Sequence, residues 1–480
     1  MVKSRIVNAS VAFALILSGC GGGDGGGSTA TAVTPTPAPA PTGNTCSLID
    51  RQNWAFAQLN EWYLFPETLP ASLDPAPFTT VPAYIDALTA TARGQGRDRF
   101  FTHLVSIAQE NAFFSSGSSA GFGFRIATDT PARRAFIMEA FEGTAALGAG
   151  IDRGDELLAI GDTPTTLRTV TDIIAAEGAA GVTAAFGPST AGVTRTLRVA
   201  GTAGTRNLTI SKTDFTLTPV SARYGTQVIT DGALRVGYLN LRTFISTADP
   251  ALRTAFDSFR AQGITSFIVD FRYNGGGLVS TAELMGDLLG GNRTTSDVYS
   301  LTTFRASKPS QNSTRRFAPG SQSVSPVKVA FIGTGSTASA SELVINSFIP
   351  YLGTNMALIG TNTFGKPVGQ IALDRSQCDD RLRVVAFSTR NSANSDNYFN
   401  GLASTVPVTC RATDDFTRPL GNAQEASTRA ALDFLQGRSC TAISSTGQTS
   451  QASRSVSSVP LELLTPSAPT PAQREVPGVF

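Results

Sequence analysis

The second half of the chain alternates apolar stretches with amphipathic ones, and this alternation constrains the fold more than any other feature of the sequence. The stretches predicted as buried strands are Arg235–Leu241, Phe267–Phe271, Val327–Gly333 and Ala357–Gly360. Between them, Pro250–Arg260 and Ser339–Ile349 are predicted helices, and Pro350 should end the second because proline lacks the N–H that a helix needs. Strands that alternate with helices form an α/β layer, so we predict a mixed α/β fold with this layer as its core.

The remaining parts differ from this layer in composition, which predicts a multi-domain α+β chain. A length of 480 residues is also too great for one ordinary domain. The predicted parts are a signal peptide (1–20), a Gly/Pro-rich linker (21–45), a helical domain (46–115), a domain of short strands (116–215), the α/β core (216–440) and a disordered tail (441–480).

Residues 1–20 have the pattern of an export signal. A basic start precedes a short apolar run, which is too short for a bilayer that needs about twenty residues. The run ends in Leu17-Ser18-Gly19-Cys20, which resembles the lipobox of bacterial lipoproteins and makes Cys20 the predicted lipidation site. A plain secretory signal followed by a chance cysteine is the alternative. Because Gly21 rather than aspartate follows Cys20, the resemblance implies a lipid anchor on the periplasmic face of the outer membrane.

Composition excludes several classes of function. The 38 basic and 36 acidic residues leave a net charge of +2, which gives no basic surface for nucleic acid. His103 is the only histidine, so metal sites with several histidines are excluded, and a Ser-His-Asp enzyme would have to use this residue. We predict that His103 is an ordinary structural or surface histidine and that the protein needs no metal and no cofactor.

Besides Cys20 the chain contains Cys46, Cys378, Cys410 and Cys440. An even number of cysteines in an exported chain indicates disulfides, here two with three possible pairings. Cys46 and Cys440 flank the predicted folded body, whereas the other two bracket one local segment. The predicted pairs are therefore Cys46–Cys440 and Cys378–Cys410.

One run in the domain of short strands resembles a PDZ domain of the bacterial protease type. The run is Gly154-Asp155-Glu156-Leu157-Leu158-Ala159-Ile160-Gly161-Asp162. A PDZ domain binds an extended peptide as an added strand, and the N–H groups of a glycine loop capture its terminal carboxylate. By analogy the peptide-binding residues are Gly121, Phe122, Gly123 and Phe124. The alternative is that Phe122 and Phe124 are only core residues of a strand.

A serine-rich segment follows a predicted strand and opens a predicted helix. It reads Gly335-Ser336-Thr337-Ala338-Ser339-Ala340-Ser341-Glu342. A serine at this place exposes its Oγ where backbone N–H groups favour a developing oxyanion. The alternative is a helix cap, because Ser339 and Glu342 have the spacing of a capping box.

Lys366 favours catalysis over the cap. A serine nucleophile needs a base, and lysine becomes one when burial lowers its pKa, which arginine cannot do. Only five of the 38 basic residues are lysines, yet one stands in the turn Thr363-Phe364-Gly365-Lys366-Pro367, after a predicted buried strand. The alternative is an ordinary solvated turn lysine.

These segments together resemble the S41 peptidase family, the C-terminal (tail-specific) processing proteases. The blocks that carry the resemblance are Ser339-Ala340-Ser341-Glu342, Phe364-Gly365-Lys366 with Gln370, and Val269-Asp270-Phe271-Arg272-Tyr273-Asn274-Gly275-Gly276-Gly277. The resemblance covers roughly residues 46–440. It implies a crotonase/ClpP-like protease core joined to a PDZ domain and an N-terminal helical domain.

The resemblance also implies roles for single residues. The catalytic residues would be Ser339 as nucleophile, Lys366 as general base and Gln370 as the side chain that orients the lysine amine. The oxyanion donors would be the N–H groups of Ala340 and of Gly276 or Gly275. Ser341 is the near competitor of Ser339. Two features depart from the family: Lys366 follows Ser339 by 27 residues, slightly more than usual, and Pro367 replaces the usual glycine.

The predicted function is that of an envelope serine endopeptidase that recognises C-terminal segments through its PDZ domain and cleaves peptide bonds via an acyl-enzyme. Its partners would be proteins or peptides with exposed C-termini, and a lipid anchor would give its only membrane contact. One alternative is a catalytically inactive envelope lipoprotein that binds peptides or other ligands on the same scaffold. Another is a peptidase with one narrow physiological target.

Overall fold

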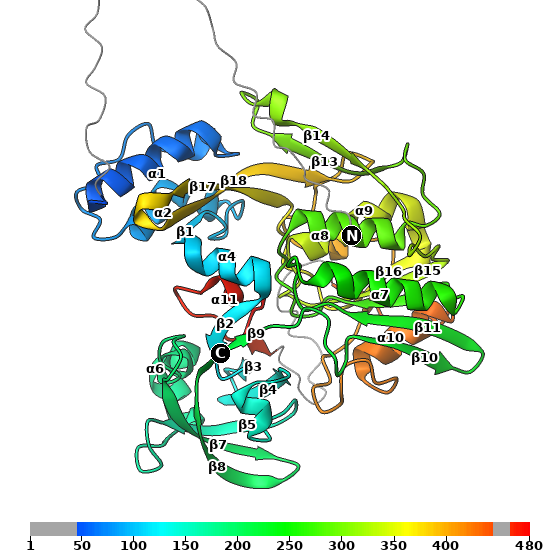
Figure 1. Cartoon of the computed structure of the whole chain (residues 1–480), viewed down its shortest axis with the longest axis horizontal. Coiled ribbons are helices and arrows are strands. Elements are labelled where there is room, and N and C mark those ends of the chain that lie inside the picture. The colour runs from blue at the N-terminus through cyan, green and yellow to red at the C-terminus, as the bar shows by residue number, and fades with distance from the viewer. Residues whose placement is uncertain (1–45, 445–460) are drawn as a thin grey trace, which may run out of the picture. The chain divides into compact units, whose positions relative to one another are not determined.

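The predicted α/β layer forms a six-stranded sheet in the computed structural model, which describes residues 46–444 and 461–480 (Figure 1). The strand order is β10-β11-β12-β15-β16-β19, and every neighbouring pair except β10–β11 is parallel. The strands are β10 (Thr226–Asp231), β11 (Leu234–Asn240), β12 (Ser266–Asp270), β15 (Lys328–Gly333), β16 (Met356–Gly360) and β19 (Thr409–Arg411). The mixed α/β prediction is confirmed.

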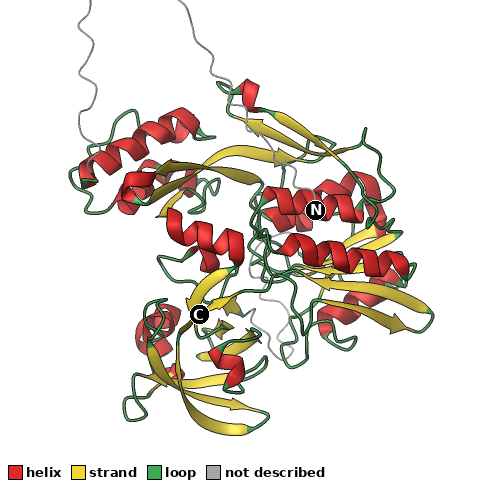
Figure 2. Cartoon of the chain, viewed as in Figure 1, coloured by secondary structure: helices red, strands yellow, loops and turns green. Residues whose placement is uncertain are grey.

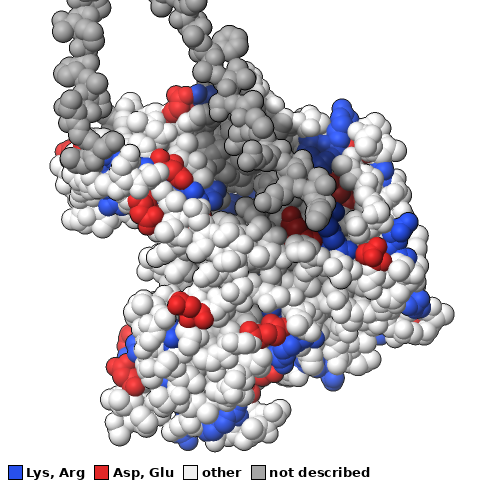
Figure 3. Space-filling model, viewed as in Figure 1, with Lys and Arg blue, Asp and Glu red and all other residues white. Residues whose placement is uncertain are grey.

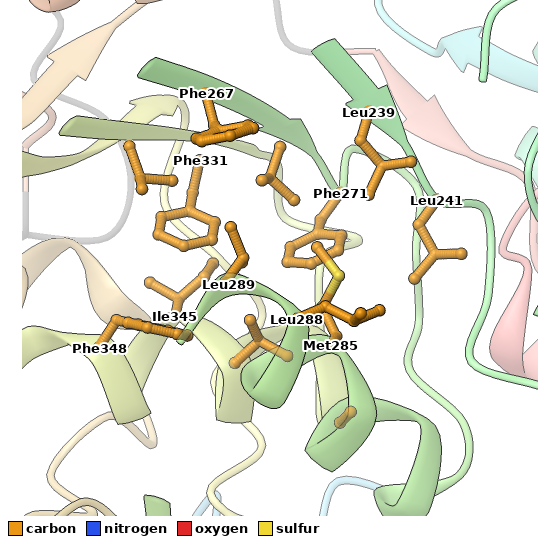
Figure 4. Packing of buried hydrophobic residues seen from close by; sticks show 14 of the residues in the cluster. Leu239, Leu241, Phe267, Phe271, Met285, Leu288, Leu289, Phe331, Ile345 and Phe348 are labelled. Atoms are coloured by element: carbon orange, nitrogen blue, oxygen red, sulfur yellow. The ribbon is translucent and has the colours of Figure 1, made fainter. Parts of the chain in front are cut away.

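Helices cover both faces of this sheet, as Figure 2 shows. The helices are α7 (Ala248–Ala261), α8 (Val279–Leu289) and α9 (Ala340–Leu352) on one face and α10 (Ala426–Leu435) on the other. Successive residues of a strand point to opposite faces, so Phe267 packs toward α7–α9 while Ile268 packs toward α10. Figure 4 shows phenylalanines of β12 and β15 lying against leucines of α8. Burial of each such side chain contributes about 1.5–3 kcal/mol.

Helix α9 runs through Pro350 to Leu352, so the prediction that Pro350 ends the helix is wrong. Proline removes the hydrogen bond to the carbonyl four residues earlier, here that of Asn346. Asn391 Nδ2 donates to this carbonyl at 3.3 Å instead. The lost bond lies in the last turn of the helix and has a replacement, so the helix continues.

Residues 118–216, which we call the middle module, contribute most strands of the second large sheet, and β20 (Glu462–Leu463) from the end of the chain contributes another. The order is β20-β3-β4-β5-β7-β8, with β6 beside β5, while β2 pairs with β9. The elements are β2 (Ser118–Gly121), β3 (Phe124–Asp129), β4 (Arg134–Ala140), α5 (Ala145–Gly148), β5 (Glu156–Gly161), β6 (Arg168–Thr169), α6 (Val170–Ala185), β7 (Thr194–Gly201), β8 (Gly204–Ser211) and β9 (Thr213–Thr216). The sheet packs its apolar face on α6.

The predicted helical domain packs on a third sheet, with the order β1-β18-β13-β14 and β17 beside β18. The helices are α1 (Leu48–Trp62), α2 (Val81–Leu88), α3 (Ala90–Gly94) and α4 (Ile107–Ser116). The strands are β1 (His103–Ser106), β13 (Val298–Phe304), β14 (Ser313–Arg316), β17 (Val368–Arg375) and β18 (Asp380–Arg390). This sheet continues directly from the turn that contains Lys366, so it connects the helical domain to that turn.

The disulfides join Cys46 to Cys378 and Cys410 to Cys440, so the predicted pairing was wrong. The β17–β18 hairpin places its turn beside the start of α1, where Arg51 forms an ion pair with Asp380 at 2.6 Å. Cys378 therefore meets Cys46, with 5.5 Å between their Cα atoms. Position along the chain could not reveal this pairing, because it depends on where a long hairpin turns.

The end of the chain is ordered, contrary to the prediction of a disordered tail over 441–480. Residues 461–480, which we call the tail segment, contain β20 (Glu462–Leu463) and α11 (Pro471–Glu475). Its β20 pairs with β3 of the middle module. The predicted signal peptide, Cys20 and the linker lie outside the described residues, as do residues 445–460.

Acidic and basic side chains are interspersed on the face that Figure 3 shows. Many of them form ion pairs across the surface, for example Arg381 with Asp374. Such a mixed surface agrees with the small net charge of +2. None of the helices within 46–444 and 461–480 is long and apolar enough to cross a membrane.

Candidate active site

Ser339 stands at the junction between β15 and α9 in an unusual backbone conformation. Its φ of 54° and ψ of −113° are costly for a residue with a side chain, and such outliers concentrate at functional sites. The residue is half-buried, so its hydroxyl is not enclosed in the core. Its N–H donates to Glu342 Oε2 at 3.0 Å. The local structure thus holds a strained serine at a helix N-terminus.

Ser341, the competing serine, has a different environment. Its side chain is fully buried, and its Oγ donates to the carbonyl of Asn274 at 3.2 Å. This hydrogen bond ties α9 to the loop of residues 274–277, which we call the glycine loop. The environment suits a structural serine better than a nucleophile.

Glu342 connects the serine to the lysine. Its buried carboxylate also accepts hydrogen bonds from Thr363 Oγ1 at 2.6 Å, Gly365 N at 2.6 Å and Lys366 N at 2.7 Å. Burial raises the pKa of this carboxyl, and the surrounding hydrogen bonds act in the opposite direction. The capping interaction predicted from the sequence is present, but the same carboxylate also fixes residues 363–366, which we call the lysine turn.

Lys366 is partly buried, with charged side chains such as Glu475 and Arg474 in its surroundings. Its Nζ donates to Gln370 Oε1 at 2.9 Å and lies 4.9 Å from the ring centroid of Phe101. Burial is the main cause that lowers the pKa of Lys366 below 10.5. Gln370 is held in turn, because its Nε2 donates to the carbonyl of Phe101 at 2.5 Å. Within the described residues no hydrogen bond joins Lys366 Nζ to Ser339 Oγ.

The glycine loop approaches Ser339 closely. A Cβ on Gly276 would lie 2.8 Å from the Cβ of Ser339, and the φ of Gly276 is 121°, so only glycine fits there. The N–H of Gly276 already donates to Asn274 Oδ1 at 2.9 Å. The N–H of Gly275 instead donates to the carbonyl of Glu475, at 2.9 Å. Of the two predicted glycine donors, Gly275 is therefore the one that holds a peptide carbonyl.

A buried ion network behind the glycine loop was missed by the sequence analysis. Arg272 forms an ion pair with Asp270 and a bidentate ion pair with Glu425. Both hydrogen bonds from Arg272 to Glu425 are 2.9 Å long. Burial acts to raise the pKa of Glu425, but Arg272 and the hydrogen bonds outweigh it and lower the pKa to about 2. The network fixes the strand end from which the loop leaves. Arg272 stood within a recognised block, whereas nothing near Glu425 indicated its role.

Arg99 of the helical domain is a second residue that the sequence did not single out. Its guanidinium donates to the carbonyls of Phe364 at 2.6 Å and Gly365 at 2.5 Å, and it stacks on the ring of Phe364. The helical domain therefore supports the lysine turn directly. A contact between residues 265 positions apart leaves no local pattern in a sequence.

His103 lies near the lysine but shows no catalytic geometry. Its Nδ1 is 2.7 Å from the carbonyl oxygen of Phe101, which favours the tautomer with a proton on Nδ1. Burial lowers the pKa of His103 well below 6.5, so the ring is neutral at pH 7. Within the described residues no group of histidine, cysteine, aspartate and glutamate could hold a metal ion.

The predicted peptide-binding residues form a bend between β2 and β3. Phe122 and Phe124 are fully buried, and their rings stack with centroids 5.8 Å apart. The N–H of Gly123 donates to the carbonyl oxygen of Phe480 at 2.8 Å, and that of Phe124 does so at 3.4 Å. The bend thus holds the last residue of the sequence, and both phenylalanines also belong to the module's core.

A cavity of about 2030 Å³ adjoins these elements. Lys366, Gln370 and Gly275 line it, together with Arg474 and Glu475 of the tail segment. Ser339 does not line the cavity itself, although its neighbour Ala338 does. Lys366 and Gly275 therefore line an open space with the serine beside it, and the N–H of Gly275 is already occupied by the tail segment.

Comparison with known proteins finds similarity to peptidases in both the family model and the relatives. Residues 235–406 match the model of peptidase family S41. The chain is 28% identical over 274 residues to carboxyl-terminal-processing peptidase 3, chloroplastic, of Arabidopsis thaliana, which covers 55% of this chain and 49% of that protein. It is 25% identical over 262 residues to the carboxyl-terminal-processing protease of Synechocystis sp., covering 55% of this chain and 56% of that protein.

A solved structure extends the similarity over most of the fold. The structure of a candidate S41 protease from Bacteroides fragilis has a TM-score of 0.61 and 22% sequence identity, and it covers 80% of this chain and 97% of that one. The fold is therefore one found among S41 protease structures. The chain spans about half the length of the curated relatives it matches.

Proposed function

We propose that this protein is a serine endopeptidase that cleaves protein substrates with a Ser339–Lys366 dyad. The observation that carries the proposal is the position of Glu342, whose one carboxylate accepts the N–H groups of both Ser339 and Lys366. A helix cap alone would need only the first of these bonds. The match of residues 235–406 to peptidase family S41 supports the same activity.

In this mechanism neutral Lys366 accepts the proton of Ser339 Oγ while the oxygen attacks the substrate carbonyl carbon. The N–H groups of Gly275 and Ala340 would donate to the resulting oxyanion. The C–N bond then breaks, and the leaving amine takes the proton from Lys366. Water hydrolyses the ester by the same steps in reverse order. The lowered pKa of Lys366 supports its role as base.

The missing hydrogen bond between Ser339 and Lys366 requires a small movement before catalysis. Catalytic hydrogen bonds are often long in unliganded enzymes and shorten when substrate binds. A rotation of the lysine side chain would be sufficient, because neutral Nζ has two N–H donors and one lone pair. It can therefore donate to Gln370 and accept the hydroxyl hydrogen of Ser339 at the same time.

The middle module would act as a PDZ domain that binds C-terminal segments of substrates. The bend at Gly123 offers N–H groups to a carbonyl or carboxylate, and the side of β3 that faces away from β4 already pairs with an extended segment, residues 478–480.

For the location, we propose export and lipid attachment at Cys20, with the protein on the periplasmic face of the outer membrane. Mass spectrometry of the membrane fraction tests the lipid on Cys20.

The test of the activity is digestion of an unfolded protein by the chain with its disulfides intact. Ser339→Ala and Lys366→Ala should abolish the fragments seen by mass spectrometry, whereas Ser341→Ala should retain them if it folds. Loss with Ser341→Ala alone, in a folded variant, would move the nucleophile to Ser341. Absence of cleavage by the unaltered chain would favour an inactive peptide-binding protein. The lack of a hydrogen bond between Ser339 and Lys366 is compatible with that alternative.

A further inference from the structure

The tail segment packs into the same two places that the proposed function assigns to substrates. Figure 1 shows α11, in red, beside α4. Its capping box between Thr470 and Gln473 sets the start of the helix. After the helix Val476 and Val479 are buried at 0% and 4% exposure in one apolar cluster with Phe113 and Phe141. The segment is thus part of the folded structure.

At the middle module the tail segment continues the sheet. Phe480 N donates to Phe124 O at 3.0 Å, and Ile126 N donates to Gly478 O at 2.9 Å, which is an antiparallel pairing along β3. The ring of Phe480 is 3% exposed and lies 4.9 Å from the centroid of Phe186. Backbone pairing together with an apolar pocket for the last side chain is how an added strand is bound.

At the candidate active site the tail segment accepts the hydrogen bond of the Gly275 N–H, which is a proposed oxyanion donor. The carbonyl of Glu475 accepts the N–H of Gly275 at 2.9 Å, and a Cβ on Gly275 would lie 2.5 Å from the carbonyl oxygen of Arg474. The Glu475 side chain also interacts electrostatically with Lys366. A substrate carbonyl could not reach Gly275 while the tail segment is in place.

The tail segment is bound in a form that disfavours cleavage. Glu475 is the last residue of α11, and the N–H of Val476 donates back to Ala472 O at 2.8 Å. A protease acts on a peptide bond that is free of such internal bonds and open to attack from one side. The helical turn therefore keeps the Glu475–Val476 bond in the site without presenting it.

We propose that residues 471–480 are a resident ligand of one continuous peptide-binding surface, and that they exclude other proteins until a competing segment displaces them. The surface runs to the glycine loop from the side of β3 that pairs with residues 478–480 and the site beside Phe186 that holds Phe480, which together we call the groove along β3. The competitor would have the same chemistry: small or apolar residues and an aromatic residue at its end. This inference rests on the proposed peptidase function for its effect on activity, whereas the binding itself does not.

Covalent attachment makes such a ligand effective even if its intrinsic affinity is low. An attached segment meets its site at an effective concentration on the order of millimolar, so a free peptide of equal affinity binds only weakly while the attached one is intact. Weakening the attached segment should therefore raise both the affinity for added peptide and the rate of substrate cleavage.

The test uses the full chain with Phe480→Asp, and with Ser467→Asp as the matched control. The first change puts a charge into an apolar pocket, which is costly, whereas Ser467 is exposed in the same segment. A fluorescent peptide of residues 471–480 should bind Phe480→Asp at least tenfold more tightly than it binds the unaltered chain or the control. Cleavage of an unfolded protein should rise about tenfold in Phe480→Asp only.

The outcomes separate the two proposals. Equal peptide affinity in all three proteins would overturn the resident ligand, even if all of them cleave. A difference in affinity with no cleavage by any of them would retain the ligand and refute the peptidase. If Phe480→Asp does not fold, hydrogen exchange of residues 471–480 in the unaltered chain gives the answer: it should rise on adding saturating peptide, and an unchanged rate would overturn the inference.

Discussion

The lysine turn and the groove along β3 hold their residues by different interactions. At the lysine turn, one buried carboxylate makes four hydrogen bonds of 2.6–3.0 Å that set where Ser339 and Lys366 lie. In the groove, backbone pairing and aromatic packing hold Phe480. Hydrogen bonds to a buried charge depend steeply on geometry, whereas apolar contacts adapt to small changes in shape. Side-chain positions are thus strictly fixed at the site where the peptide bond would be cleaved, and less strictly fixed in the groove where the end of a peptide would bind.

Glu342→Gln gives the largest expected effect, because an amide cannot accept all four hydrogen bonds without facing N–H groups with its own. We expect kcat/KM to fall about a hundredfold, as misplacement of a catalytic group by about 1 Å does. The fall should lie in kcat. The control is Glu67→Gln, which is at the surface. A fall in kcat/KM of less than threefold in a folded Glu342→Gln variant would show that the lysine turn tolerates small displacements as well as the groove does.

Glu425→Gln tests the support behind the glycine loop. The folded pKa of Glu425, about 2, is below its ordinary value of 4.5, so its ionised form stabilises the folded state. This stabilisation is fully present above pH 4.5 and is lost as pH falls towards 2. We expect Glu425→Gln to lower the free energy of unfolding by about 3 kcal/mol at pH 7. Denaturant titrations of both proteins check this, and a difference that grew on acidification would contradict it.

The pH dependence of activity tests the base. Because burial lowers the pKa of Lys366 below 10.5, the neutral amine should appear at a lower pH than in an exposed lysine. The value of kcat/KM should rise about tenfold per pH unit below that pKa and then level off. Lys366→Arg should remain inactive at every pH, since arginine stays charged. Activity retained by a folded Lys366→Arg variant would argue against lysine as the base.

The smallest effect belongs to the groove. Phe186→Leu removes one aromatic contact with Phe480, and such pairs contribute about 0.5–1.5 kcal/mol. In the Phe480→Asp background, we expect the fluorescent peptide of residues 471–480 to bind a few-fold more weakly after this change. A loss of a hundredfold or more would mean that the groove is set as strictly as the lysine turn.

The sequence predicted those features that local patterns determine. The alternation of apolar and amphipathic stretches predicted the six-stranded sheet, with β11 and β12 within one residue of their predicted bounds. The serine, lysine and glycine blocks were recognised from short runs, and the structure brings these runs together. Gln370 was placed as a partner of Lys366, and it does accept a hydrogen bond from Nζ.

The rest depended on contacts between distant parts of the chain. The disulfides follow from the position of a hairpin turn, and Arg99 supports the lysine turn from 265 residues away. The tail segment was predicted to be disordered because the chain after Cys440 is rich in serine, threonine and glutamine and then in proline. Its order comes from packing against the middle module and α4, which composition does not reveal.

The central claim is that Ser339 and Lys366 act as one catalytic unit. The most direct measurement is a double-mutant cycle on kcat/KM with Ser339→Ala, Lys366→Ala and both together, in the Phe480→Asp background that frees the site. Members of one catalytic unit are not additive, so the double variant should lose no more activity than either single variant. If the two losses instead multiply, or if Lys366→Ala retains the activity of its parent, the two residues do not form a dyad.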